Sequence, residues 1–373
     1  MAAQKIKTDY RAVSAQVEKH IVDGQWIDDD PQSPTLLARQ WSLAGEWVAA
    51  WLDARPSVSP DDLTVAINEL APSSGRADYL ALNGTTFVVA APGPIGNVFI
   101  VTRSGDHYRL AWSTAESQKS NGRGAEVLAA WRAENARHGG RGPYWAASGR
   151  AGPVSPRLGM LPEDAAGHGR FYIDGFYAQS AGGTAGAQIS LWVWDGVTAH
   201  PLIARDYVMM IDQQVGTRLE GNLLKVQEKK SFRAFFSCGG CEERQTDWIV
   251  RITNTGIEDL GEKVVAPELD AVDELFYRLI HGRSATGLAA PDAIEAAKRL
   301  VRDARGVSSA KAWKDFPTLG MMMGWKLAKD GEQEILCLNT DPTGPNLFKL
   351  KPVGNAFFIA EIRETKEDCG KLR

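Results

Sequence analysis

The chain has 373 residues, of which 44% are hydrophobic and 24% charged, a composition typical of a soluble globular protein rather than a disordered one. Its 42 lysines and arginines are balanced by 46 aspartates and glutamates, and no basic run follows the pattern of a phosphate-binding stripe, so nucleic acid is not expected as a partner. No apolar segment approaches the ~20 residues needed to span a bilayer, and we therefore predict no transmembrane segment.

The first 75 residues are predicted to form helices. In 8–22, apolar side chains recur at steps of three and four, which lines one helix face. A second helix is expected to begin at Ser33, where a capping hydroxyl precedes a proline, and to carry tryptophans along its apolar side. The sequence Ser-Pro-Asp-Asp at 59–62 combines a cap, a proline and two acidic residues, and it predicts a third, short helix.

From Tyr79 onward the apolar residues alternate or form short β-branched and aromatic runs separated by glycine, a pattern typical of strands and turns. Four segments have the pattern of a hairpin with a strand-like run before it, and the hairpins span 96–112, 187–210, 246–265 and 346–363. The second contains Asp-Gly at 195–196, a pair favoured in tight hairpin turns. This part of the chain therefore predicts four similar antiparallel β units.

Three helical segments are predicted to interrupt the β units, near 123–138, 267–282 and 290–306. The chain then divides into a helical N-terminal region, 1–75, and a β body, 76–373, that carries these insertions. The predicted fold is mainly β, or α+β overall. Repeated antiparallel units are typical of a β-propeller, in which each sheet packs on its neighbours, and a sandwich-like or barrel-like arrangement fits the same pattern.

The four cysteines of the chain are Cys238, Cys241, Cys337 and Cys369. A redox pair in Cys-Gly-Gly-Cys would begin a helix, whereas the residues that follow predict a turn and a strand. Structural zinc requires four ligands, and the other two cysteines do not form a second close pair, so no metal and no cofactor is predicted. We favour two disulfides, Cys238 with Cys241 and Cys337 with Cys369, as in an oxidising compartment; unpaired cytoplasmic thiols are the alternative.

Residues 168–195 combine polar and aromatic side chains on predicted strands. The glycine-rich connection within this segment lacks the lysine and the following helix of a phosphate-binding loop. Aromatic rings in a pocket stack on sugars, although rings in strands more often fill the core. The candidate ligand-binding residues of the segment are Tyr172, Tyr177, Gln179, Gln188, Trp192 and Trp194.

Acid–base hydrolysis of a glycosidic bond requires two carboxylates about 5–10 Å apart. The sequence contains several acidic residues in or near the β units, for which surface ion pairs are the simpler explanation. The best candidate loop is 212–221, which follows a strongly apolar strand and concentrates charged and amide side chains. The candidate catalytic residues are Asp174, Asp212, Glu220, Asp247 and His168, and the candidate anion-binding residues are Arg218 and Arg244.

No complete catalytic motif is found in the sequence, which lacks both a Gly-x-Ser-x-Gly elbow and a His-Glu-x-x-His zinc motif. We therefore predict a non-catalytic binding or scaffold protein of a bacterial envelope or periplasm, whose partner is an unknown small molecule, glycan or protein. The small residues Ala2 and Ala3 fit a secreted chain whose signal has been removed. The alternatives are a glycosidase-like hydrolase and a metal- or thiol-dependent protein centred on Cys238 and Cys241.

Overall fold

The computed structural model describes residues 2–369 except for several segments. Those segments are 23–32, 56–59, 71–77, 92–96, 114–156, 180–183, 211–215, 231, 236–243, 316, 331–332, 342 and 367–368. The chain divides into two compact units. The first unit comprises Met1–Ala181, Ala185–Leu224 and Val250–Asp259, and the second comprises Gly182–Thr184, Lys225–Ile249 and Leu260–Arg373.

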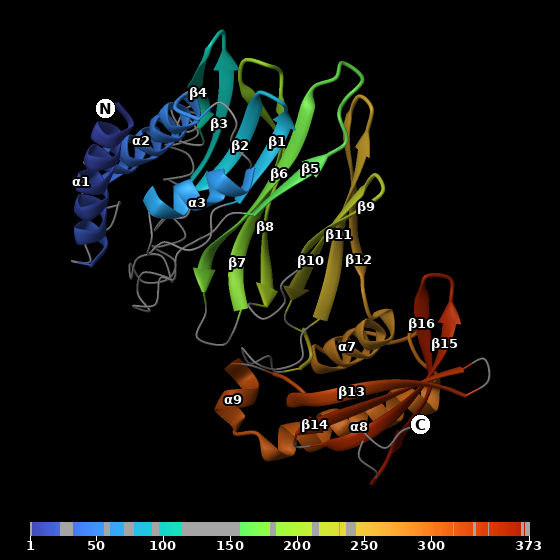
Figure 1. The fold of residues 1–373 in the computed structure, drawn as a ribbon. Coiled ribbons are helices and arrows are strands. Elements are labelled where there is room, and N and C mark those ends of the chain that lie inside the picture. The colour runs from blue at the N-terminus through green and yellow to red at the C-terminus, as the bar shows by residue number, and fades with distance from the viewer. Residues whose placement is uncertain are drawn as a thin grey trace. The chain divides into compact units, whose positions relative to one another are not determined.

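Helices cover one face of the first sheet in the first unit (Figure 1). The helices are α1 (Ala2–Val22), α2 (Ser33–Asp53) and α3 (Pro60–Leu70), and the strands, in sheet order, are β1 (Asp78–Asn83), β2 (Thr86–Ala91), β3 (Asn97–Ser104) and β4 (His107–Ser113). The helical period places Trp47 and Trp51 on the buried side of α2, with ring centroids 6.4 Å apart. Both rings share a core with Val89 and Phe99 of the sheet.

A second sheet packs on the other face of the first. Its strands, in sheet order, are β5 (Arg157–Leu161), β6 (Gly169–Gln179), β7 (Thr184–Trp194) and β8 (Ala199–Met210). Neighbouring side chains of β2 point to opposite faces of the first sheet. Val89 therefore packs with the helices, while Val88 packs with the second sheet. Trp112 of β4 and Trp192 of β7 meet in the layer between the sheets, with ring centroids 5.0 Å apart.

The third sheet has the order β12-β11-β10-β9, and the boundary between the units passes through it. Its strands are β9 (Thr217–Glu220), β10 (Leu223–Lys230), β11 (Arg244–Thr253) and β12 (Gly256–Val264). Arg170 of β6 is only 1% exposed and donates to the carbonyl oxygens of Thr253 and Gly256 at the β11–β12 turn, and to those of Pro162 and Glu163, at 2.6–3.1 Å. These four acceptors replace the water that a buried guanidinium loses.

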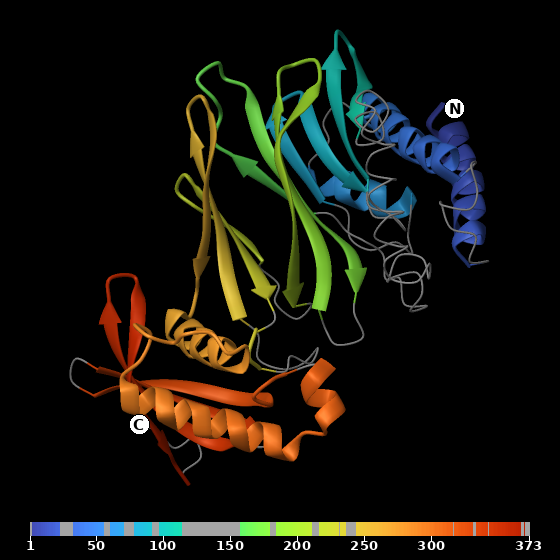
Figure 2. The same ribbon diagram turned by 180° about the vertical axis from the view of Figure 1, so that it is seen from behind.

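The second unit packs helices on a fourth sheet. Its elements are α7 (Pro267–Ile280), α8 (Pro291–Val307), α9 (Ala310–Asp315), β13 (Met321–Asp330), β14 (Gln333–Asp341), β15 (Gly344–Val353) and β16 (Ala356–Glu364). Phe276 of α7 and Leu300 of α8 share a core with Leu336 and Phe348 of the sheet. The buried stripe of α8 consists mainly of alanines, so this helix can lie close to the sheet that it crosses (Figure 2).

These elements confirm the predicted fold class, which is mainly β and α+β overall, with a helical N-terminus and inserted helices. Each of the four sheets is an antiparallel meander with its strands in sequence order, and none closes into a barrel among the described strands. In the fourth sheet, as in the first, helices pack on one face. The helix predicted near 123–138 lies outside the described residues. No helix in the described part of the chain is long and apolar enough to cross a membrane.

Candidate functional site

A group of polar and aromatic side chains gathers where four strands of the first unit meet, and we call it the Tyr172 cluster. Its members, on β1, β5, β6 and β9, are Asp78, Arg157, Tyr172, Asp174 and Thr217. In the antiparallel pairing of β5 with β6, Arg157 lies opposite Asp174, and Gly159 lies opposite Tyr172. Paired and alternate residues share one face of a sheet, so these side chains project from the same side.

A glycine on β5 makes room for Tyr172. A Cβ atom at Gly159 would lie 2.0 Å from ring carbons of Tyr172 and 2.3 Å from its hydroxyl oxygen. Any other residue at this position would displace the ring, because protein interiors leave no space for overlapping atoms. The ring of Tyr172 is therefore held against the backbone of β5.

Asp174 joins two segments that are distant in the sequence. The Thr217 hydroxyl donates a hydrogen bond of 2.8 Å to Oδ2 of Asp174, and only 6% of Asp174 is exposed. One partner comes from the aromatic and polar segment 168–195, and the other comes from the polar loop 212–221. The two segments that the sequence suggests for a glycosidase-like site are therefore neighbours in the first unit.

Asp78 at the start of β1 holds the adjoining strand β5. Its Oδ2 accepts a hydrogen bond from the backbone N–H of Leu158, and its Oδ1 accepts one from Tyr79, both at 2.9 Å. The first of these bonds links strands of two different sheets. It fixes a second carboxylate near the Tyr172 ring.

The electrostatics of the Tyr172 cluster favour a neutral phenol. Burial raises the pKa of Tyr172, the negative charges of Asp174 and Asp78 raise it further, and Arg157 lowers it. The hydroxyl therefore keeps its proton at neutral pH and is available as a donor. The cluster contains two carboxyl groups and one guanidinium, so its formal charge is negative when both acids are ionised.

Three other predicted residues of the first unit form local polar contacts. Nε of Arg218 lies 3.0 Å from Oε1 of Glu220, and both side chains are accessible to solvent. Nδ1 of His168 lies 2.9 Å from Oδ2 of Asp164. The backbone N–H of His168 also donates to Asp164, and this bond is the largest of the causes that lower the pKa of that carboxyl group. His168 is thus engaged in closing its own turn.

The two predicted tryptophans lie inside the first unit. Trp192 and Trp194 are 9% and 4% exposed and belong to the core between the first and second sheets. The indole N–H of Trp192 donates to the Ser190 hydroxyl at 2.8 Å, so its polar atom is satisfied within the protein. Their position is that of core residues rather than of a ligand platform.

Several predicted residues fall outside what the structure describes. Asp212, Cys238 and Cys241 lie in segments without described positions. Tyr177 and Gln179 belong to β6, and Gln188 belongs to β7, but only the backbone is described at these three positions. Their roles stay predictions.

The remaining two predicted residues belong to the second unit. Arg244 forms an ion pair with Asp270 in the first turns of α7. Asp247 lies on β11 and is 9% exposed. Neither residue is in the same unit as the Tyr172 cluster.

A buried ion pair in the second unit was not predicted. Asp273 of α7 is fully buried and accepts hydrogen bonds from the backbone N–H groups of Arg233 and Ala234, at 3.0 and 2.8 Å, and from Nε of Arg233 at 2.9 Å. Burial raises the pKa of Asp273 although these hydrogen bonds lower it. The signal available in the sequence is that Asp273 stands on the apolar face of α7, beside Val272 and Phe276, where a carboxylate requires a partner.

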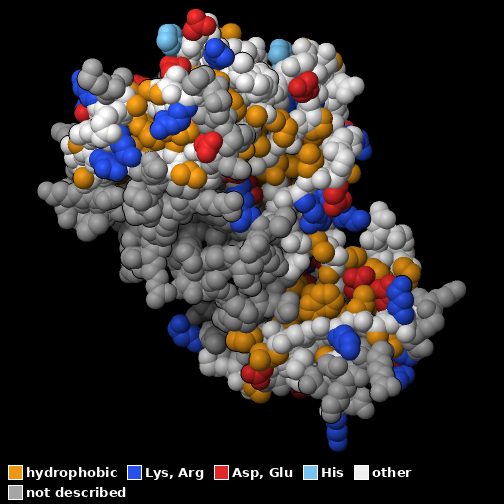
Figure 3. Space-filling model, in the orientation of Figure 1, with side chains coloured by type: hydrophobic (Ala, Val, Ile, Leu, Met, Phe, Trp, Pro, Cys, Tyr) orange, Lys and Arg blue, Asp and Glu red, His pale blue; other side chains and the backbone are white. Residues whose placement is uncertain are grey.

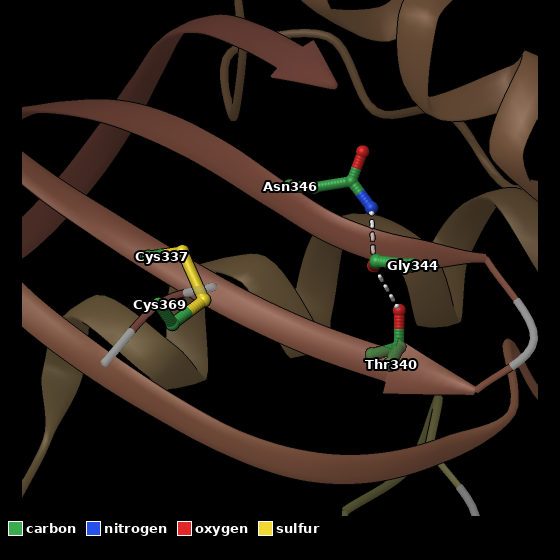
Figure 4. Close-up of a disulfide and its surroundings, with 5 residues drawn as sticks. All are labelled: Cys337, Thr340, Gly344, Asn346 and Cys369. Carbon is green, nitrogen blue, oxygen red and sulfur yellow. Dashed lines mark hydrogen bonds between the residues drawn. A yellow bond between two sulfur atoms is a disulfide. The ribbon is translucent and has the colours of Figure 1, made fainter. Parts of the chain in front are cut away.

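A disulfide joins Cys337 of β14 to Cys369, as predicted (Figure 4). Both cysteines are buried, at 1% and 5% exposure. Near the end of β14, the Thr340 hydroxyl donates a hydrogen bond of 3.2 Å to the carbonyl oxygen of Gly344 on β15. The same oxygen accepts one of 3.0 Å from the Asn346 amide, and together they close the β14–β15 turn.

On the face drawn in Figure 3, basic and acidic side chains are interspersed. No group of three or more His, Cys, Asp or Glu side chains within the described segments is arranged to hold a metal ion. Comparison of the chain with protein-family models gave no match, and comparison with curated proteins gave none either. The function therefore has to be inferred from the residues themselves.

Proposed function

We propose that the protein is a non-catalytic binding protein and that the Tyr172 cluster contacts its ligand. The ligand class that we infer is a polyhydroxylated molecule such as a glycan. The observation that carries the proposal is the hydrogen bond between Thr217 and Asp174, which completes a polar group on four strands beside a half-buried aromatic ring.

The chemistry of the Tyr172 cluster suits a sugar. A carboxylate oxygen of Asp78, which is partly exposed, can accept hydrogen bonds from hydroxyl groups, while Arg157 and Tyr172 can donate them. The exposed part of the Tyr172 ring can contact the apolar face of a pyranose. Two carboxylates against one guanidinium disfavour an anionic ligand.

The position of Asp174 supports binding rather than hydrolysis. A general acid has to come within about 2.6–3.2 Å of the oxygen that it protonates. With 6% exposure and a hydrogen bond from Thr217, Asp174 is shielded from a substrate unless Thr217 moves. A buried carboxylate that orders its neighbours is suited to shaping a binding site.

A panel of oligosaccharides tests this proposal, first on a glycan array and then by calorimetry with those that bind. Tyr172→Phe removes a hydroxyl and keeps the ring, and Asp78→Asn removes a charge. Both variants should weaken binding about ten-fold, the effect of losing one hydrogen bond to the ligand. Tyr108→Phe on β4 is the matched control, because Tyr108 packs with the helices outside the cluster, and it should leave binding unchanged. Failure of every glycan to bind, or binding that is insensitive to both cluster variants, would refute the proposal.

A glycosidase-like hydrolase is the second candidate. It is favoured by the hydrogen bond between Asp174 of segment 168–195 and Thr217, which belongs to the described part of segment 212–221. Turnover of a panel of aryl glycosides and esters tests it. Wild-type turnover that is lost in Asp174→Asn and retained in Glu220→Gln would replace the binding proposal with this one.

We also propose that the protein functions in a bacterial envelope or periplasm. The disulfide between Cys337 and Cys369 supports an oxidising compartment. Alkylation of the protein from its native source under denaturing, non-reducing conditions would contradict this location if it labelled four thiols. The intact mass of the native protein tests the remaining alternative, since a metal bound through Cys238 and Cys241 would favour a metal-dependent protein.

A further inference from the structure

A basic pocket lies between the end of α7 and the middle of α8 in the second unit. Its volume is about 350 Å³, and its lining residues are Leu279, Gly282, Arg283, Lys298, Val301 and Arg302. Three of these six are cations and none is acidic, while Leu279 and Val301 supply apolar surface. A small number of charged groups around an apolar wall is the usual composition of a small-molecule site.

The cations of the pocket are held in place by neighbouring side chains. The guanidinium carbon of Arg283 lies 5.3 Å from the ring centroid of Tyr277, within the range of a cation–π contact. Nζ of Lys298 lies 2.6 Å from Oε1 of Glu295. Lys298, through a hydrogen bond and its charge, and Arg302, through its charge, lower the pKa of Glu295. Glu295 pairs with Lys298, and the lining of the pocket itself carries three cations and no carboxylate.

The carbonyl groups at the end of α7 do not prevent an anion from binding in the pocket. Helix C-termini repel anions through their last carbonyl groups when these lack donors. Here the N–H groups of 281–283 donate to the carbonyl oxygens of Tyr277, Leu279 and Arg278 at 2.7–3.2 Å. Gly282, at φ 65°, adopts the left-handed conformation that ends the helix in this way. Three carbonyl groups in the last turn of α7 are thus already paired.

We propose that this pocket binds a small oxyanion carried on a short apolar chain. Arg283 and Arg302 would hold the anion by charge-assisted hydrogen bonds, and Leu279 and Val301 would contact the chain. Carboxylates and phosphate monoesters share this chemistry. The pocket belongs entirely to the second unit, so the proposal is independent of the Tyr172 cluster and survives if the glycan proposal fails.

Calorimetric titration of the full-length protein at low salt tests the pocket with hexyl phosphate and hexanoate. Arg302→Gln and Arg283→Gln should each weaken binding of the better probe about ten-fold, since each removes one charge-assisted contact. Arg299→Gln and Arg305→Gln are matched controls, because both residues are exposed on α8 and neither lines the pocket. Circular dichroism verifies that each variant is folded.

Two further probes separate the parts of the proposed ligand. Inorganic phosphate carries the charge without the chain, and 1-hexanol carries the chain without the charge, so both should bind at least about ten-fold more weakly than the better probe. The proposal is supported if hexyl phosphate or hexanoate binds more tightly than both inorganic phosphate and 1-hexanol. The tighter of the two charged probes then identifies the anion. The proposal is overturned if neither probe binds saturably, if the control variants lose as much affinity as the pocket variants, or if either single-feature probe binds as tightly.

Discussion

Removal of the disulfide between Cys337 and Cys369 should destabilise the second unit strongly. The two cysteines are 32 residues apart in sequence, so reduction releases a loop of that length in the unfolded chain. The chain-entropy relation assigns such a loop a stabilisation of about 3.7 kcal/mol at 25 °C. For a unit of ~140 residues, this corresponds to a decrease in Tm of roughly 10 °C. The effect is large because a folded unit is stabilised by only about 5–15 kcal/mol in total.

Differential scanning calorimetry combined with hydrogen exchange measures this effect and locates it. The variant Cys337→Ala/Cys369→Ala should lower the unfolding temperature and the protection of β14 and β15, while the first unit serves as an internal reference. Cys238→Ser/Cys241→Ser is the matched control, because it removes the other two cysteines without opening this loop. Reductant should lower the unfolding temperature of the wild type and of the control variant by more than that of the double alanine variant. A double alanine variant that melts within about 2 °C of the wild type would refute the loop-entropy argument.

Three other perturbations test the structure. Arg170→Met should cost about 3–5 kcal/mol, measured by chemical denaturation, because it leaves buried carbonyl groups without their donor; a cost below about 1 kcal/mol would contradict the observed bonds. Asp273→Asn should destabilise the second unit by about 3 kcal/mol, because the carboxylate that it replaces is buried. Asp270 is partly exposed, and Asp270→Asn should cost less than about 1 kcal/mol. Equal losses of stability in the two variants would be inconsistent with the difference in burial of the two side chains. Hydrogen bonds at the β7–β8 turn, above all from the Thr198 backbone, lower the pKa of Asp195 to about 2. Since the folded-state pKa lies below that of the unfolded chain, Asp195 stabilises the fold fully above about pH 5, and this contribution should disappear as the pH falls from about 4 to 2. Thermal unfolding of wild type and Asp195→Asn across that range measures it, and a pH-independent difference would contradict the assignment.

The candidate site was predictable only in part. Tyr172 and Asp174 were identified because they stand on one predicted strand, two residues apart, and the loop that contains Thr217 was identified by its polar composition. Asp78 and Arg157 were missed because neither belongs to a motif, and their role depends on how β1 and β5 lie beside β6. Trp192 and Trp194 were named as candidates although both lie in the core, since the sequence does not tell which face of a strand meets another sheet.

The sequence by itself determined the type of most elements. Side-chain period and turn residues distinguish helix from strand locally, which is why the helical N-terminus, the antiparallel units and the helices α7 and α8 could be predicted. Only the tertiary structure decided which faces stack and which distant residues meet. Arg170 reaches acceptors more than 80 positions away, and Asp174 meets Thr217 across 43. Contacts of this kind depend on the packing of whole sheets. The alternation of side chains along one strand does not determine which other sheet that strand will face.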